Sequence, residues 1–166
     1  MEELLSFSGA KRDKLKNIID IGCGVGGSSR FLARSCKNAD VTGVTLSPVQ
    51  VRTQEIYQSP ACFTDPLTIL TAVQAARAQE INREEGLEQR VTNEVANALR
   101  LPYPDSSFDL AWSLESGEHM PDKEAWLAEV YRILKPGGTF VCVTWCHRET
   151  VEEQLSASEV RLLGRI

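Results

Sequence analysis

Ten residues near the amino terminus, DIGCGVGGSS from Asp20 to Ser29, constrain this chain more than any other segment. They follow the apolar pair Ile18-Ile19 and precede a helical pattern from Arg30 to Arg34, which indicates a strand, a glycine turn and a helix. Backbone N–H groups at such a helix start can bind a nucleotide-like ligand. An NAD site usually has an acid about 20 residues further on. Here Thr45 ends the next predicted strand, so the pattern favours S-adenosylmethionine over NAD.

Length and composition describe an ordinary soluble domain. The 166 residues suffice for one domain with a real core, and 42% are hydrophobic and 25% charged. The net charge of −5 argues against nucleic acid as a main partner. No apolar run approaches the roughly 20 residues of a membrane span. The first residues, MEELLSFSGAKRDK, carry no evident targeting pattern, so the sequence by itself predicts a soluble intracellular protein.

The five cysteines are scattered, with no CxxC or Cys/His spacing. We therefore expect free thiols, and neither a zinc site nor a disulfide framework.

Strands and helices are predicted to alternate. The expected strands are 17–21, 41–45, 91–95, 108–112 and 139–145. The expected helices are a short amphipathic one within 1–16, one capped by Ser28 or Ser29 and running to Cys36, and others starting at Ser47-Pro48, at Pro66, at Asp122 and at Glu149. Gly86 should stop the Pro66 helix, and Pro136-Gly137-Gly138 the Asp122 helix. This order predicts an α/β fold: a Rossmann-like, doubly wound, mostly parallel sheet with helices on both faces, truncated after about the fifth strand.

We expect residues 1–166 to form a single domain, with one unusual segment. Without Val51 to Gln74, SPVQ would join AARAQEINREEGL as one continuous helix, and Val-Gln occurs at both edges of the segment. Valine codons begin with GT and glutamine codons can end in AG, the usual intron boundaries. We hypothesise that 51–74 is a retained intron; the alternative is a genuine surface insertion, although long loops in compact domains are unusual.

The glycine turn and the next two strand ends supply candidate ligand contacts. Gly22, Gly24 and Gly26, with Cys23 between them, let the backbone approach a ligand without Cβ clash. Asp20 would orient the turn or meet the cationic amino-acid end of the donor, directly or through water. The alternatives are a turn needed only for packing, or a different nucleotide site.

Two further candidate pairs follow the second and third predicted strands. Thr45 and Gln50 can hold a ribose by their hydroxyl and amide; capping of the next helix by Thr45 or Ser47 is the alternative. Asn97 and Ala98 can read an adenine edge, unless Asn97 is an ordinary turn residue.

The segment SLESGEHMPDK, 113–123, leaves the fourth strand at the same sheet edge and holds Glu115, Glu118 and His119. Methyl transfer to a phenol or its ring carbon needs a base that deprotonates the hydroxyl and later removes the ring proton. We therefore name Glu115 and His119 as catalytic candidates. The alternatives are that Glu118 caps a helix, that His119 merely packs, and that Met120-Pro121 is a rigid turn.

The fifth predicted strand should end beside this edge at Trp145, Cys146 and His147, with Cys146 a packed thiol. The other two tryptophans, Trp112 and Trp126, are expected in the core.

Together these motifs resemble the plant and algal γ-tocopherol methyltransferases, within the class I S-adenosylmethionine-dependent methyltransferases. The resemblance rests on DIGCGVGGSSRFLA, VTGVTLSPVQ, LPYPDSSFDLAWSLESGEHMPDK, LKPGG and VTWCHR, and covers most of 17–148 apart from 51–74. It implies methyl transfer from S-adenosylmethionine to a chromanol ring carbon, γ- to α-tocopherol or δ- to β-tocopherol. The donor would be held by Asp20, Gly22, Gly24, Thr45, Gln50, Asn97 and Ala98, with Glu115 and His119 facing the acceptor.

The same resemblance implies a plastid location and a small lipophilic acceptor, with peripheral membrane contact open for the full-length parent. Relatives with similar motifs methylate sterol side chains or alkaloid nitrogens. Against the family pattern, Asn97 stands where Asp is usual, and a longer amino-terminal region and the carboxyl-terminal part of a seven-stranded sheet are absent. We therefore expect a partial chain. A nicotinamide-dependent oxidoreductase and a donor-binding module without turnover are the rival interpretations.

Overall fold

A computed structural model describes residues 1–45 and 66–145 of the chain. Several predictions therefore lie outside the described residues. These concern Gln50, Cys62, Cys146, His147, the helix start at Ser47-Pro48, most of the 51–74 segment and the helix from Glu149.

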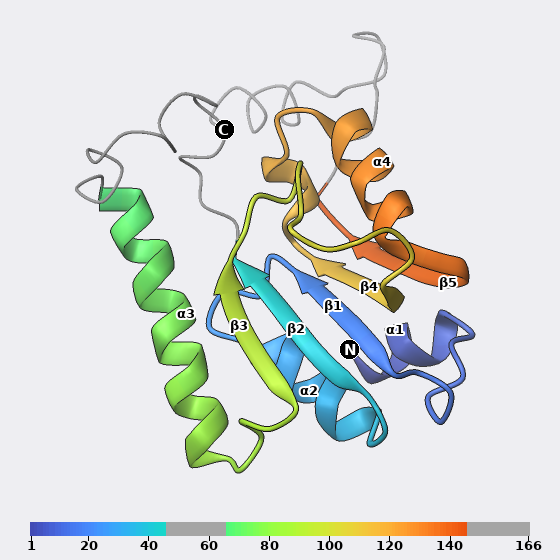
Figure 1. Cartoon of the computed structure of the whole chain (residues 1–166), viewed down its shortest axis with the longest axis horizontal. Helices are drawn as coiled ribbons and strands as arrows, with labels where there is room; N and C mark the ends of the chain where they lie inside the picture. The colour runs from blue at the N-terminus through green and yellow to red at the C-terminus, as the bar shows by residue number, and fades with distance from the viewer. Residues whose placement is uncertain (46–65, 146–166) are drawn as a thin grey trace, which may run out of the picture.

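Within the described residues, the core of the fold is one five-stranded sheet in the order β3-β2-β1-β4-β5. The strands are β1 (Asn17–Ile21), β2 (Asp40–Thr45), β3 (Val91–Val95), β4 (Phe108–Leu114) and β5 (Leu134–Val143). Every neighbouring pair is parallel (Figure 1). The predicted parallel α/β sheet is therefore confirmed, and three of its strands begin and end within a residue of the predicted bounds.

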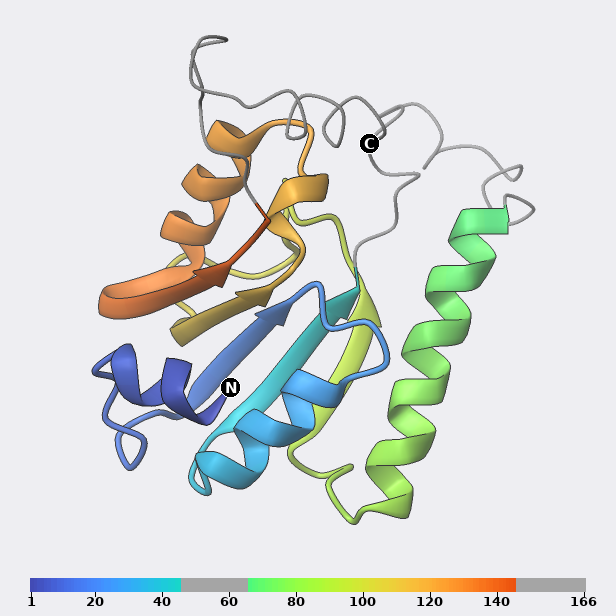
Figure 2. The ribbon, with the colours of Figure 1, turned by 180° about the vertical axis from the view of Figure 1, so that it is seen from behind.

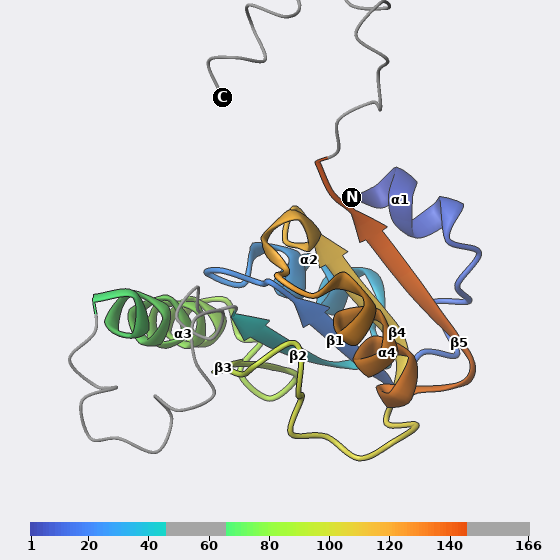
Figure 3. The same cartoon turned by 90° about the horizontal axis from the view of Figure 1, so that it is seen from above.

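Helices cover both faces of the sheet, as predicted. On one face, α1 (Glu2–Phe7) and α2 (Gly27–Ser35) enclose a core that contains Leu5, Leu32 and Trp112 (Figure 2). On the other face, α4 (Lys123–Ile133) encloses a second core around Ile19, Trp126 and Val130 (Figure 3). Trp112 and Trp126 are core residues, as expected.

The long helix α3 (Pro66–Glu84) packs along the edge strand β3 (Figure 1). It ends near Gly86, whose φ of +66° is the left-handed conformation typical of a helix stop, as predicted. Its first described buried side chain is Ala75.

The start of β5 differs from the prediction. We expected Pro136-Gly137-Gly138 to separate α4 from a strand beginning at Thr139, but β5 already begins at Leu134. A Cβ at Gly138 would lie 2.8 Å from the carbonyl oxygen of Lys135, in β5 itself, and 3.3 Å from the carbonyl oxygen of Asp109 in β4, so a glycine is needed at this position. The pairing shifts between Phe108 and Leu110, which is how the extra residues are absorbed.

The cysteines and the helix lengths agree with the predictions made from composition, as far as the described residues show. Cys23, Cys36 and Cys142 are free thiols. None of the described helices combines the length and the apolar character that a membrane span needs.

Candidate functional site

The sheet order places a switch point between β1 and β4. From β1 the chain runs outward to β2 and β3, and then returns to β4 on the other side of β1. In open α/β sheets, ligands bind outside the carboxyl ends of the strands where the order reverses in this way. The glycine turn follows β1 and the Glu115 loop follows β4, so both predicted loops leave the sheet at this point.

Two serines tie these loops together. Ser116 Oγ donates a hydrogen bond to the Ile21 carbonyl oxygen at 3.0 Å and is 2.6 Å from Ser113 Oγ. Both serines are buried. The sequence reasoning did not single them out, because an isolated serine near a strand end gives no pattern.

The glycine turn is anchored to β2 and open at its tip. The N–H groups of Gly22 and Cys23 both donate to the Val44 carbonyl oxygen, at 2.8 and 3.0 Å. Gly22, Gly24 and Gly26 have φ values of +90°, +53° and +77°, which only glycine adopts without strain. A Cβ built on Gly24 would meet no atom within 4 Å. The turn therefore leaves room for a ligand at Gly24.

Asp20 is buried and orients the start of α2. Its Oδ2 accepts hydrogen bonds of 2.6 Å from both Ser28 Oγ and Ser29 Oγ. Burial raises the pKa of Asp20 to about 6, although these hydrogen bonds act in the opposite direction. Of the two roles considered for Asp20, this geometry supports orienting the turn.

The prediction that Ser28 or Ser29 caps α2 is wrong. The N-cap is Gly26, with no side-chain cap bond. The two hydroxyls are instead drawn to the buried carboxylate of Asp20, which offers a charge-assisted hydrogen bond.

Cys23 is a packed thiol. Burial, with a smaller contribution from the nearby Asp20 carboxylate, raises the pKa of Cys23 to about 12. Its sulfur accepts a hydrogen bond from Asn93 Nδ2 at 3.3 Å. The neutral thiol thus serves as part of the turn's packing.

Thr45 ends β2 with a buried hydroxyl. The residue is 1% exposed, and its Oγ1 has no hydrogen-bond partner among the described residues. Leaving a buried hydroxyl unpaired costs about 1–3 kcal/mol. A hydroxyl in this position at the carboxyl edge fits a ligand with polar atoms, such as the ribose of a nucleoside.

Asn97 follows β3 and forms a local turn. Its Oδ1 accepts a hydrogen bond from the Leu99 N–H at 2.9 Å, and Ala98 is buried. The amide oxygen therefore has the turn role that we considered as the alternative, which leaves the Nδ2 group for other contacts.

The Glu115 loop lies at the switch point. Glu115 has a φ of +52°, rare for a residue with a side chain, and its N–H donates to the Val143 carbonyl oxygen at 2.7 Å. Its side chain is exposed. Backbone strain of this kind is concentrated at functional sites. His119, also exposed, ends a short 3-10 helix η4 (Gly117–His119).

Glu118 does not cap this helix. It accepts a hydrogen bond of 2.7 Å from Thr144 Oγ1, which holds its pKa below the usual value. Glu118 thus ties the loop to the end of β5. Nearby, Trp145 is 75% exposed at the same edge of the sheet.

A buried polar network lies beneath the turn and was not predicted from the sequence. Asp20, Gly43 and Asn93 lie side by side on three adjacent strands. A Cβ on Gly43 would lie 2.6 Å from Ser29 Oγ and 2.9 Å from Cys23 Sγ, and would also collide with Asn93 Nδ2. Two signals could have identified this network: a glycine inside a strand pattern and an asparagine at an inward strand position.

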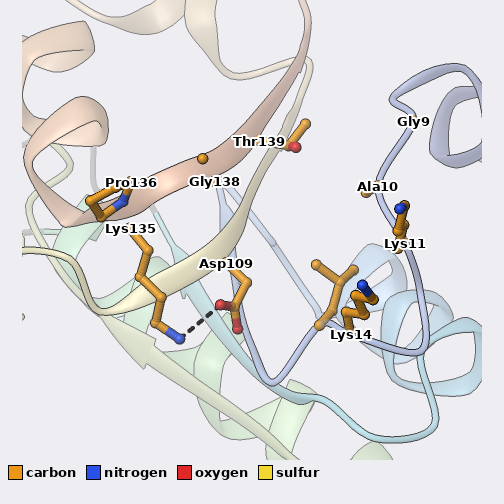
Figure 4. A pocket seen from close by; sticks show the side chains of 11 residues that line it. Gly9, Ala10, Lys11, Lys14, Asp109, Lys135, Pro136, Gly138 and Thr139 are labelled. Carbon is orange, nitrogen blue, oxygen red and sulfur yellow. Dashed lines mark hydrogen bonds and ion pairs between the residues drawn. The ribbon is translucent and has the colours of Figure 1, made fainter.

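A hollow of about 370 Å³ lies at the opposite, amino-terminal edge of the sheet (Figure 4). Lys11 and Lys14 line one side of it and Lys135 the other. Asp109 accepts hydrogen bonds from Lys135 Nζ and from the backbone N–H groups of Lys16 and Asn17. Although burial opposes this, those bonds hold the pKa of Asp109 below its usual value. This hollow is remote from the switch point and is not the predicted donor site.

The fold thus defines a doubly wound α/β domain with a candidate ligand site at its switch point. A family model described as "Methyltransferase domain" matches residues 1–163. The chain belongs to this methyltransferase family, and the prediction of a class I methyltransferase domain is confirmed.

Two plant proteins are similar to this chain along its whole length. The chain is 42% identical to "Probable tocopherol O-methyltransferase, chloroplastic" of Oryza sativa subsp. japonica, over 100% of the chain and 40% of that protein. It is 40% identical to "Tocopherol O-methyltransferase, chloroplastic" of Arabidopsis thaliana, over 100% of the chain and 42% of that protein. The chain therefore spans about two fifths of the length of these relatives.

Among solved structures, geranyl diphosphate C-methyltransferase of Streptomyces coelicolor A3(2) is similar in fold, with a TM-score of 0.66 and 26% identity. The match covers 86% of this chain and 43% of that one, and that structure contains Mg²⁺, geranyl diphosphate and S-adenosyl-L-homocysteine.

Proposed function

We propose that this chain is the donor-binding part of an enzyme that transfers a methyl group from S-adenosylmethionine to a ring carbon of a tocopherol, converting γ- to α-tocopherol. The observation that carries the proposal is the 40–42% identity to two proteins named tocopherol O-methyltransferases along the whole chain. The chloroplastic names of both relatives extend the proposal to a plastid location.

The donor is assigned to the switch-point edge. S-adenosylmethionine supplies an electrophilic methyl group on sulfur when it is bound. Gly22, Cys23, Gly24 and Gly26 bring the backbone close to it, with Asp20 holding the turn in place. The unpaired hydroxyl of Thr45, with Gln50, receives the ribose, and Asn97 and Ala98 receive the adenine. The solved structure of similar fold that contains S-adenosyl-L-homocysteine supports the identity of the donor.

Glu115 and His119 are assigned to the acceptor side. A phenol becomes nucleophilic when its hydroxyl proton is removed, and the ring proton must leave after the methyl group has bonded to carbon. Both steps need a base close to the donor methyl group. Glu115 follows β4, which lies next to the strand β1 that leads into the glycine turn. His119 supplies an imidazole from the same loop.

Carbon and oxygen methylation must be distinguished by experiment. A phenolate can react at oxygen or at the ring carbon, and the names of the two plant relatives specify oxygen. The similar structure from Streptomyces is named a carbon methyltransferase. Incubation with methyl-labelled S-adenosylmethionine and γ-tocopherol, followed by NMR of the product, decides: a new ring methyl with a free hydroxyl supports our proposal, and a methoxy group contradicts it.

Parallel incubations address the other acceptors. Label in a sterol or in an alkaloid amine, with none in tocopherol, would replace the proposed acceptor with another small molecule. Binding of S-adenosylhomocysteine without incorporation into any acceptor would leave a donor-binding chain without activity. Recovery of the chain with lipid vesicles that contain tocopherol tests the further proposal of peripheral membrane contact.

A further inference from the structure

Arg30 is a buried cation beneath the glycine turn, and the proposed donor contacts do not use it. The residue is 8% exposed. Its Nη1 donates a hydrogen bond of 2.9 Å to the Val25 carbonyl oxygen at the tip of the turn. A Cβ on Gly26 would lie 2.9 Å from the same nitrogen. The guanidinium group therefore supports the turn at two successive residues.

Helix α3 holds Arg30 from the far side. Arg30 Nη1 is 3.4 Å from Asn82 Oδ1, and Arg30 Nε is 3.4 Å from Glu85 Oε2, just beyond the end of α3. Asn82 is 1% exposed and is itself fixed, because its Nδ2 donates to the Val91 carbonyl oxygen at 3.1 Å. The cation thus bridges a rigid helix end and a glycine-rich turn.

A second connection runs in parallel through β3. Asn82 Nδ2 also donates to Asn93 Oδ1 at 2.8 Å, and Asn93 Nδ2 is 3.4 Å from Ser29 Oγ. Ser29 in turn donates to Asp20. Asn82 and Glu85 both follow position 74, so neither residue belongs to the 51–74 segment.

We infer that Arg30 is a positioning residue for the donor, and that Asn82 and Glu85 fix the glycine turn through it. The inference rests on the proposed donor site. Three glycines with positive φ give the turn a large conformational freedom in solution. A ligand that binds such a turn must order it unless the protein has already done so. The Val25 carbonyl is the anchor at the tip, where the Gly24 side is open to the ligand.

Arg34 provides a matched control on the same helix. It also forms an ion pair with Glu85, but its side chain is 56% exposed and it lies one turn further from the glycine turn. Arg34→Met removes a cation and a Glu85 contact without removing a contact to the turn. Arg30→Met removes the contact to Val25 as well.

The test is calorimetric titration of the 166-residue chain with S-adenosylhomocysteine, for wild type, Arg30→Met, Arg30→Lys and Arg34→Met. We expect Arg30→Met to weaken the affinity about tenfold, as loss of one charge-assisted hydrogen bond implies, and Arg34→Met to change it less than about twofold. Arg30→Lys keeps the charge beside Glu85 but lacks the planar guanidinium fork. It should recover unfolding stability to a greater extent than donor affinity.

Hydrogen exchange of the backbone N–H groups at 22–27, measured without ligand, gives an independent readout. It should accelerate in Arg30→Met and Arg30→Lys but not in Arg34→Met. Wild-type affinity in folded Arg30 variants, or equal losses in the Arg30 and Arg34 variants, would overturn the inference. If wild type does not bind S-adenosylhomocysteine, the proposed donor site fails, and the exchange data still decide whether Arg30 orders the turn. If Arg30→Met does not fold, the titration and the hydrogen exchange are both measured on Arg30→Lys.

Discussion

The substitution Gly43→Ala tests the packing beneath the glycine turn. Gly43 lies in β2 between Asp20 and Asn93, and its φ is not in the left-handed region, so alanine introduces no backbone strain there. The added Cβ instead overlaps three buried side-chain atoms, from Ser29, Cys23 and Asn93. The effect of this substitution therefore reports on the packing and hydrogen bonding of these buried groups, without a contribution from backbone strain.

The cost can be worked from these contacts. Overpacking a tight core by one carbon costs about 1–3 kcal/mol. Displacing Asn93 also breaks its hydrogen bonds to Ser29 and Cys23, and an unpaired buried polar group adds about 1–3 kcal/mol. We expect Gly43→Ala to lower the free energy of unfolding by about 3 kcal/mol, or the Tm by about 6–12 °C.

Equilibrium urea unfolding followed by circular dichroism measures this loss. Gly27→Ala is the matched control, since Gly27 begins α2 and a Cβ there meets no atom within 4 Å. It should stabilise the chain by about 0.5–1 kcal/mol, because alanine has the higher helix propensity. In the Asn93→Ala background, Gly43→Ala should cost less, since one of the three overlapping groups is gone. A Gly43→Ala variant within about 0.5 kcal/mol of wild type would refute the reasoning.

Three other outcomes are expected. Because the pKa of Asp20 is about 6 in the folded chain and 3.8 ordinarily, the unfolded state loses this proton first as the pH rises. Between about pH 4 and pH 7, wild type should therefore lose about 3 kcal/mol of unfolding free energy relative to Asp20→Asn. Asp13→Asn, at an exposed position, is the control. If the unfolding free energies of wild type and Asp20→Asn change in parallel with pH, the reasoning is wrong. Thr45→Val should leave the stability unchanged or raised, since it removes an unpaired buried hydroxyl, yet weaken S-adenosylhomocysteine binding about tenfold, whereas equal affinity would remove Thr45 from the donor site. We also propose that 51–74 is foreign sequence. A chain without this segment should fold and bind S-adenosylhomocysteine at least as tightly as the 166-residue chain. A mature transcript that lacks the segment would support the proposal, and a mature transcript that contains it would exclude the proposal.

Local signals were sufficient for most elements of the fold. A few residues were enough to predict the strand NIIDI, the glycine turn and the helix stop at Gly86. Glycine conformation and hydrophobic period are local properties of the sequence. The start of β5 was misjudged because the glycines of KPGG have the composition of a helix stop. That the strand already begins at Leu134 depends on its pairing with Phe108 of β4, which no neighbouring residue in the sequence reveals.

For the site, the sequence by itself determined which residues reach the carboxyl edge of a parallel sheet. Asp20 and Thr45 lie at the ends of strands, and the glycine turn and the Glu115 loop follow strands, that their own patterns identify. Only the tertiary structure decided what each one contacts. Strand order and register bring Gly43 beside Asn93 and draw Ser28 and Ser29 to Asp20. They also leave the Thr45 hydroxyl without a hydrogen-bond partner among the described residues and set Arg30 between α3 and the turn. Contacts of this kind join residues far apart in the chain: Asn93 and Cys23 are 70 positions apart, and Ser116 and Ile21 are 95 positions apart. They are set by how sheet and helices pack, and the periodicity of a single segment carries no information about its distant partners.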